Sequence, residues 1–402
     1  MNRIGTRLLK RCYVHRLHQE IAASRLADQQ SSELMPALVN QTPLPTEVVA
    51  LLDQHATQFF LILVSATFEA LPGTRIRLAE EQLPLWDVDS YRGEPGASSV
   101  VHEGDFVLEK PMVDVLVNGH AFAPKGRKVE QLRVALQVGP LKKELQITGN
   151  RFWKQGLLGA APSSPEPFET MPIVYERAYG GIDTRSTDPG KHVSDPRNPI
   201  GAGFRGAPPQ NPDIQTELPN IEYPRQLMTS TSSHPEPAGF GVVSKNWRPR
   251  IGFAGTYDDG WLAEQWPLLP LDFNPRFFQA APLDQQTDEI RGGMPVVLTN
   301  MTPEGSWKFV LPTLNVPVRL AYGDREETAQ LRLDTIELEP EKYRFKLTAR
   351  VKVPLVRNRS PLRVVVLGDV TPGWWSALRY DKEYLDWDGR DGRVLDAQVF
   401  FP

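Results

Sequence analysis

The sequence predicts a mainly β protein (a β-rich α+β fold) with an antiparallel sheet or sandwich and an N-terminal helix. Apolar runs have the length of strands, and apolar and polar residues alternate with a period of two in both halves of the chain. Between these halves, residues 156–283 hold 19 of the 37 prolines. We therefore expect N- and C-terminal strands to complete one sheet around a long Pro/Gly-rich irregular excursion at 156–283.

The composition limits the classes of function. The 402 residues carry a formal net charge of −4, which gives no reason to expect nucleic acid as a partner. The single cysteine, Cys12, rules out an intramolecular disulfide and is typical of a reducing compartment. No stretch approaches the roughly 20 apolar residues of a membrane span. We expect a cytoplasmic protein.

Residues 1–36 are predicted to form a basic amphipathic helix or extension. Apolar residues recur at helical spacing from Leu9 to Ile21, and residues 1–25 contain six Lys or Arg against one acid. Packing on the protein's own surface is the favoured interpretation. A docking or membrane-surface helix is an alternative, and so is a translation start at Met35.

The N-terminal strands are predicted from three signals. The run Phe59–Val64 is continuously apolar and has the length of a buried strand. Asn118-Gly119 lies between two short apolar runs and predicts a hairpin. Residues 132–138 alternate, and Gly139-Pro140 is expected to turn the chain into a second alternating run.

The C-terminal half repeats this pattern after residue 290. Glu339-Pro340-Glu341-Lys342 predicts a turn between two alternating runs. The excursion at 156–283 contains many aromatic residues, which can anchor irregular backbone to a core. The tail at 369–402 is also rich in aromatic residues.

The glycines of "NPIGAGFRGAPPQNP" have the spacing of a dinucleotide-binding loop. Gly201, Gly203 and Gly206 form G-x-G-x-x-G, but a turn-forming stretch precedes them and several prolines follow. A nucleotide loop needs a strand before it and a helix after it. We therefore expect these glycines to provide positive φ angles and close backbone approach, with no cofactor.

No metal site is expected. His15 and His18 lie three residues apart, with only Cys12 and Glu20 as nearby ligands, which falls short of a closed zinc site. The segment "DWDGRDGRVLDA" begins like a calcium loop, but Arg390 stands at the third ligand position and Ala397 where the bidentate Glu belongs.

The acids Asp258, Asp259, Asp272 and Glu176 are the one candidate hydrolytic set. Two carboxylates can cleave a glycosidic bond when they flank it. The simpler interpretation is an Asp-Asp-Gly turn and solvated surface. We expect no enzymatic activity. A carbohydrate- or peptidoglycan-acting hydrolase using the acids near Asp258 stays open as the alternative.

Three groups of stretches together resemble one bacterial family. The stretches are "DFVLEKPMVDVLVNGHAFAPKGR" with "VGPLKKELQITGNRFW"; "MPIVYERAYGG", "NPIGAGF", "LPNIEYP", "AGFG" and "WRPRIGFAGTYDDGW"; and "PLLPLDFNPRFFQAAPLDQQ". In their order and spacing, over about residues 39–353, the chain resembles the family called domain of unknown function 2169 (DUF2169), which is associated with type VI secretion.

The resemblance implies an adaptor or chaperone that binds a secreted effector and helps load it onto a spike of the valine–glycine-repeat or PAAR type. A structural component exported with the spike is another alternative. Aromatic residues with adjacent arginine suit partner contacts, although core packing is the more frequent role of large aromatics. The candidate contacts are Trp374, Trp375, Trp387, Phe400 and Phe401 in the tail, and Arg276, Phe277 and Phe278.

Overall fold

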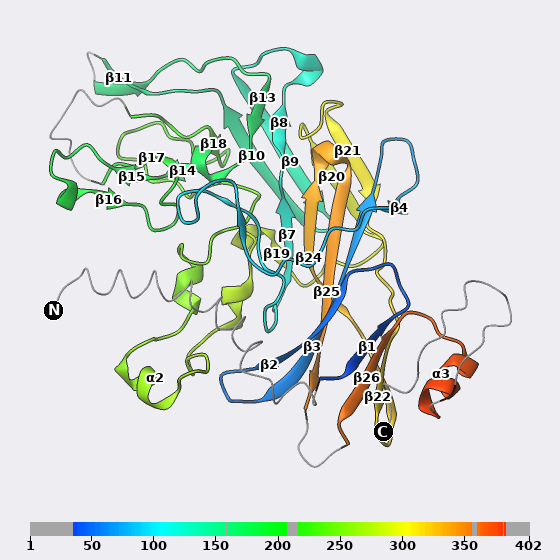
Figure 1. Cartoon of the computed structure of the whole chain (residues 1–402). Coiled ribbons are helices and arrows are strands. Elements are labelled where there is room, and N and C mark those ends of the chain that lie inside the picture. The colour runs from blue at the N-terminus through cyan, green and yellow to red at the C-terminus, as the bar shows by residue number, and fades with distance from the viewer. Residues whose placement is uncertain (1–34, 157–158, 207–215, 356–359, 381, 383–402) are drawn as a thin grey trace. The chain divides into compact units, whose positions relative to one another are not determined.

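The computed structural model describes residues 35–156, 159–206, 216–355, 360–380 and 382 (Figure 1). The predicted N-terminal helix lies outside these residues except for its last two positions. Over the described residues the protein is mainly β, as predicted. The described residues form two compact units: those within Met1–Val64, Asn315–Arg332 and Ala349–Pro402 make the first, and those within Ser65–Leu314 and Leu333–Thr348 make the second.

The first unit contains a four-stranded sheet in the order β1-β26-β22-β23. β1 runs parallel to β26, with Ala37 opposite Val364, and the other two pairs are antiparallel. The strands are β1 (Ala37–Asn40), β22 (Val318–Tyr322), β23 (Glu326–Ala329) and β26 (Leu362–Leu367).

One helix packs on this sheet. Helix α3 (Pro372–Arg379) begins at Thr371, whose hydroxyl accepts a hydrogen bond from the Trp374 N–H. Trp374 and Leu378 join the core formed by β1, β22 and β26. The same unit holds the antiparallel pair of β2 (Thr46–Leu52) with the first part of β3 (Gln58–Glu69).

The second unit contains two larger sets of paired strands. In one, β3, β25, β24, β7 and β19 follow one another, with β4 beside β3. In the other, the antiparallel order is β18-β10-β9-β20-β21. The strands are β4 (Arg77–Leu78), β7 (Val113–Val117), β9 (Gln131–Val138), β10 (Leu141–Thr148), β18 (Ile221–Glu222), β19 (Gln286–Thr287), β20 (Pro295–Thr299), β21 (Ser306–Val310), β24 (Arg332–Glu339) and β25 (Arg344–Pro354).

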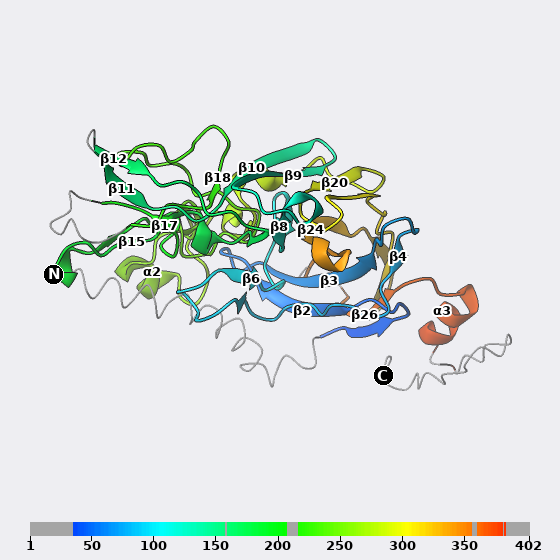
Figure 2. The same ribbon diagram turned by 90° about the horizontal axis from the view of Figure 1, so that it is seen from above.

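The inner faces of these two sheets share one hydrophobic core, and Figure 2 shows β9, β10 and β20 as a layer beside β24 and β3. The alternation predicted for 132–138 is present, since Leu132, Val134, Leu136 and Val138 are buried. The predicted turns also form: Gly139-Pro140 joins β9 to β10, and residues 340–342 join β24 to β25. The sandwich-like part of the prediction is therefore present in this unit.

Two details of the predicted sheet were wrong. Two of the sheets are mixed instead of antiparallel, because β7 runs parallel to β24 and β1 parallel to β26, whereas the sheet β18-β10-β9-β20-β21 is antiparallel as predicted. The long chain between the paired strands makes such parallel pairing possible. The hairpin predicted at Asn118-Gly119 does not form, since β8 pairs with β13 instead of β7. A Cβ on Gly119 would lie 2.8 Å from Pro340 Cγ, so this glycine permits close packing against a turn.

The excursion has very little regular structure, as predicted, and its aromatic residues are mostly buried. Its one described α-helix is α2 (Asp259–Glu264). The remaining short strands of the second unit are β5 (Ser90–Tyr91), β6 (Val100–His102), β8 (His120–Phe122), β11 (Trp153–Gly156), β12 (Gly159–Pro162), β13 (Thr170–Pro172), β14 (Tyr179–Gly180), β15 (Ile182–Asp183), β16 (Val193–Ser194) and β17 (Ala202–Gly203).

Candidate binding site

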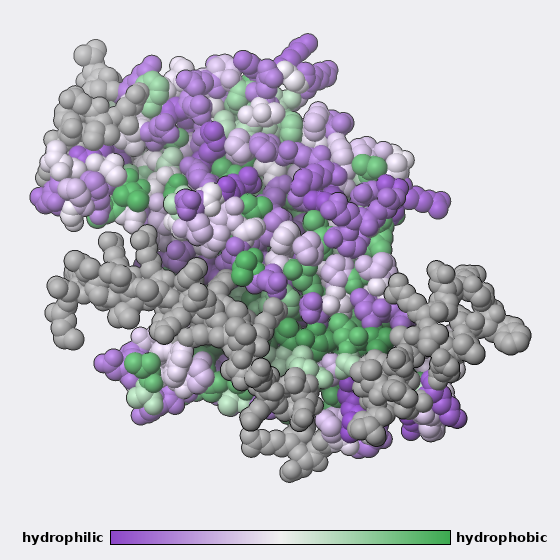
Figure 3. Space-filling model, viewed as in Figure 1, coloured by the Kyte–Doolittle hydropathy of each residue, from purple (hydrophilic) through white to green (hydrophobic). Residues whose placement is uncertain are grey.

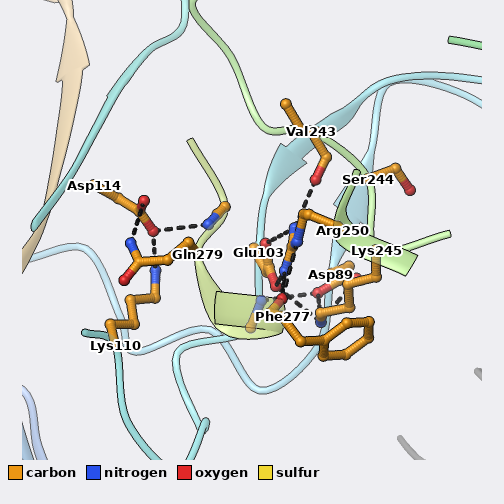
Figure 4. Close-up of polar contacts among 12 residues, drawn as sticks. Asp89, Glu103, Lys110, Asp114, Val243, Ser244, Lys245, Arg250, Phe277 and Gln279 are labelled. Atoms are coloured by element: carbon orange, nitrogen blue, oxygen red, sulfur yellow. Dashed lines mark hydrogen bonds and ion pairs between the residues drawn. The ribbon is translucent and has the colours of Figure 1, made fainter. Parts of the chain in front are cut away.

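Arg250 is a buried anchor of the excursion. Its guanidinium donates hydrogen bonds to both Glu103 oxygens at 2.7 and 2.8 Å and to the carbonyls of Val243 and Phe277 (Figure 4). Burial raises the pKa of Glu103, but the charges of Arg250 and Lys245 outweigh it and hold this pKa at about 2. Both partners are therefore charged at neutral pH, and the pair fixes the backbone around residue 250.

Asp114 on β7 is a second anchor. Its carboxylate accepts hydrogen bonds from Lys110 Nζ at 2.8 Å, Gln279 Nε2 at 2.7 Å and the Ala280 N–H at 2.8 Å. Figure 4 shows Lys110 and Gln279 converging on this carboxylate. The segment that follows Phe278 is thus attached to the central sheet.

Lys143 on β10 is a third anchor. Its ammonium donates hydrogen bonds of 2.7 Å to the Gly239 carbonyl, Asp284 and Gln285. Burial lowers the pKa of Lys143 to about 8, with Asp284 acting in the opposite direction. Lys143 is therefore mainly protonated at pH 7, where it neutralises Asp284.

Arg250 lines a cavity of about 600 Å³ in the second unit, and Lys143 holds Asp284 in the wall of the same cavity. The lining residues belong to the excursion and to the segment just after it. Its walls include Tyr175, Tyr223 and Phe253 with several prolines. Burial, followed by the charge of Asp284, raises the pKa values of both tyrosines, so they keep their hydroxyl protons. Four arginines also line the cavity: Arg197, Arg248, Arg250 and Arg276.

Most charges in the cavity wall have partners. Arg250 pairs with Glu103, Arg197 with Asp195 and Glu236, and Lys143 with Asp284. Arg248 and Arg276 are exposed, and within the described part of the chain neither guanidinium has a carboxylate partner. The cavity therefore presents two uncompensated positive charges beside aromatic and proline walls.

Both of these arginines stand on fixed backbone. The Arg248 N–H donates to the Pro196 carbonyl at 2.8 Å. The Arg276 N–H donates to the Asn274 side chain at 3.0 Å, and its guanidinium lies 4.7 Å from the centre of the Phe253 ring. Such stacking restricts the side chain while leaving its N–H groups available.

Exposed apolar side chains gather in the segment around α2. Leu262, Trp266 and Leu271 are 59%, 44% and 66% exposed. Figure 3, which has the viewpoint of Figure 1, shows hydrophobic atoms at the position of α2. Trp266 packs edge-on against the buried Trp261, which attaches this surface to the rest of the unit.

The candidate partner contacts differ in how far they are buried. Phe277 and Phe278 are buried with Phe273, in agreement with the core-packing alternative, so Arg276 is the member of that group on the surface. Trp374 is buried in the first unit, and Trp375 is half-buried beside it. Trp387, Phe400 and Phe401 lie outside the described residues. The binding role of all these candidate contacts stays a prediction.

The candidate hydrolytic acids serve local structure. Asp258 caps α2 by accepting the Trp261 N–H, and Asp272 accepts from the N–H and hydroxyl of Thr256. Those bonds lower the pKa of Asp272, the opposite of what a general acid needs. Glu176 accepts from the N–H and hydroxyl of Ser99. None of these acids, nor Asp259, lines the cavity.

The G-x-G-x-x-G stretch packs backbone against backbone. Residues 201–203 lie along β14, and β17 pairs with β14 in parallel. A Cβ on Gly201 would lie 2.6 Å from the Ala178 carbonyl oxygen, and Gly203 has φ +90°. The glycines therefore provide close approach and positive φ, as predicted.

The histidines and acids considered for zinc and calcium lie outside the described residues, which themselves contain no cluster of metal-ligating side chains.

Sequence reasoning missed Arg248 and Tyr223 as lining residues. A signal was present in "NWRPRIGF", where two arginines flank a proline with no acid nearby. The partner of Arg250 lies 147 positions away at Glu103, so the sequence could not show which arginine would be neutralised.

Within the described residues, no helix is both long and apolar enough to cross a membrane.

No curated protein and no solved structure matches the chain significantly. Residues 55–350 match the model of a family described as "uncharacterized protein conserved in bacteria (DUF2169)". Because this match covers well over half of the chain, the protein belongs to the DUF2169 family.

Proposed function

We propose that this protein is a cytoplasmic, non-enzymatic adaptor or chaperone of type VI secretion. It binds a secreted effector and assists its loading onto a spike component of the valine–glycine-repeat or PAAR type. The resemblance described above implies this role, and the match over residues 55–350 shows only that the chain belongs to the DUF2169 family. The carrying observation is the exposed apolar surface of Leu262, Trp266 and Leu271 on a well-anchored segment. Such side chains are typical anchors of protein–protein contacts.

The hydrolase alternative lacks a supporting observation among the described residues. Asp258, Asp272 and Glu176 are engaged in capping and turn contacts, and they do not converge on the cavity. The exported-component alternative makes a different prediction, because it requires the protein in the culture supernatant of secreting cells.

The test is affinity purification of the tagged full-length protein from its native cell under secreting conditions. A toxin-like protein and a spike component should co-purify. A triple variant with Leu262→Ser, Trp266→Ser and Leu271→Ser should recover about tenfold less of them, since interface anchors carry most of the binding energy. The matched control is Leu71→Ser with Leu78→Ser, which changes exposed leucines elsewhere in the same unit.

A partner-free protein would contradict the adaptor role. If the triple variant recovered as much of the partners as the wild type does, the α2 segment would not be part of the partner-binding surface. Urea unfolding of each variant shows that the fold is retained.

A further inference from the structure

The cavity in the second unit has the chemistry of an anion-recognition site. We infer that it binds an acidic segment of a partner protein, with Arg248 and Arg276 receiving two of its carboxylates. This inference rests on the proposed function for the identity of the partner as a secreted protein. The peptide chemistry itself is argued from the cavity.

The charge pattern points to carboxylates. Glu236 and Asp284 in the wall are held by Arg197 and Lys143, and Arg250 is held by Glu103. Arg248 and Arg276 are left as the cations without a carboxylate among the described residues. A guanidinium presents a planar fork of donors that matches a carboxylate in a bidentate arrangement.

The rest of the wall points to a peptide. A volume of about 600 Å³ is large enough for several residues of extended chain, and aromatic and proline side chains supply apolar contact. The Tyr223 hydroxyl donates to Asp284 at 3.0 Å, which further satisfies that acid and reduces its repulsion of an incoming carboxylate.

The site is ordered before it binds. Arg276 is stacked on Phe253, and the backbone N–H groups of both arginines have fixed acceptors. Less conformational freedom is therefore lost when a ligand arrives. This arrangement favours specific recognition over a diffuse attraction by surface charge.

The direct test uses purified full-length protein and ligand-observed NMR. The probes are acetyl-Glu-Leu-Glu-amide and its neutral analogue acetyl-Gln-Leu-Gln-amide, which have nearly the same shape. The acidic peptide should bind, and the neutral peptide should bind about tenfold more weakly or not at all. Raising the salt concentration should weaken acidic-peptide binding, because exposed charges are screened.

Variants locate the interaction. Arg248→Gln and Arg276→Gln should each weaken acidic-peptide binding by about tenfold, and the double variant by more. Arg75→Gln is the control, because Arg75 is also exposed in this unit but does not line the cavity. Equal binding of both peptides, or unchanged binding by the double variant, would overturn the inference. So would binding of inorganic phosphate without binding of the peptide.

Purification from native cells separates this inference from the proposed function. If the double variant recovers the effector as well as the wild type does, the cavity inference fails while the adaptor role stands. If no effector co-purifies but the acidic peptide binds through the two arginines, the peptide chemistry stands and the adaptor role fails.

Discussion

The two-sheet core of the second unit and the excursion at 156–283 are stabilised by different contacts. In the sheets, apolar side chains such as Val134 and Leu136 fill the interior while the backbone pairs with itself. In the excursion, most paired stretches are very short, and buried polar side chains satisfy backbone carbonyls. Arg250, Asn198 and Lys143 each bond to backbone carbonyl oxygens there.

This difference has a physical origin. A buried carbonyl without a partner is costly, and a sheet supplies partners through its ladder. Irregular backbone has no ladder, so side chains with several donors must take its place. The excursion is therefore expected to be more sensitive to loss of one polar side chain than a sheet is.

The largest effect is expected for Arg250→Met. The change leaves the Glu103 carboxylate buried with less compensation and removes donors from the Val243 and Phe277 carbonyls. The free energy of unfolding should fall by about 3–5 kcal/mol, as for other broken buried ion pairs. Urea unfolding measures the loss, and hydrogen exchange should show it first in residues 243–286.

The control for this prediction is Arg248→Met, two positions away but exposed. It should change the unfolding free energy by no more than about 0.5 kcal/mol. Equal losses for the two variants would show that the ion pair does not anchor the excursion.

The sheet side of the comparison is tested by Leu136→Ala. Leu136 is buried between the two sheets, and its truncation should cost about 2–5 kcal/mol through lost contacts and a cavity. Hydrogen exchange should accelerate across β9, β10 and β20 together. Arg133→Ala on the exposed face of the same strand should cost little, and protection lost only in the excursion would contradict the assignment of the shared core.

These two regions also differ in how far the sequence predicts them. The alternation at 132–138 was enough to place a half-buried strand, because a strand side chain repeats its environment every two residues. The hairpin at Asn118-Gly119 failed because a distant strand competed for β7. Arg276 was predicted as a partner contact together with Phe277 and Phe278; it lines the cavity, and its binding role stays a prediction. The neutralisation of Arg250 by Glu103 depends on long-range folding that no local pattern encodes.

The pH dependence of the unfolding free energy tests how much the buried Arg250–Glu103 pair stabilises the protein. Glu103 has a pKa of about 2 in the folded protein against 4.5 for the free side chain. Its contribution should be fully present above about pH 4.5 and be lost as the pH falls toward 2, amounting to roughly 3 kcal/mol. Urea unfolding at pH 7, 4.5 and 3 measures this. Glu103→Gln should be less stable than the wild type at pH 7, and the gap should narrow at pH 3; parallel profiles would contradict the assignment.

The smallest effect, and the sharpest local test, is Gly201→Ala. The added methyl group would lie 2.6 Å from the Ala178 carbonyl oxygen and 2.9 Å from Gly180 Cα, and neither backbone atom can move without separating β14 from β17. A loss of roughly 1–3 kcal/mol is expected, as for other overpacked sites. Gly252→Ala, also in the excursion, has no atom within 4 Å of the new Cβ and should be nearly neutral. Equal unfolding free energies for the two variants would mean that the backbone around residue 201 shifts to make room for the methyl group. Close backbone approach would then not explain why glycine is present at this position.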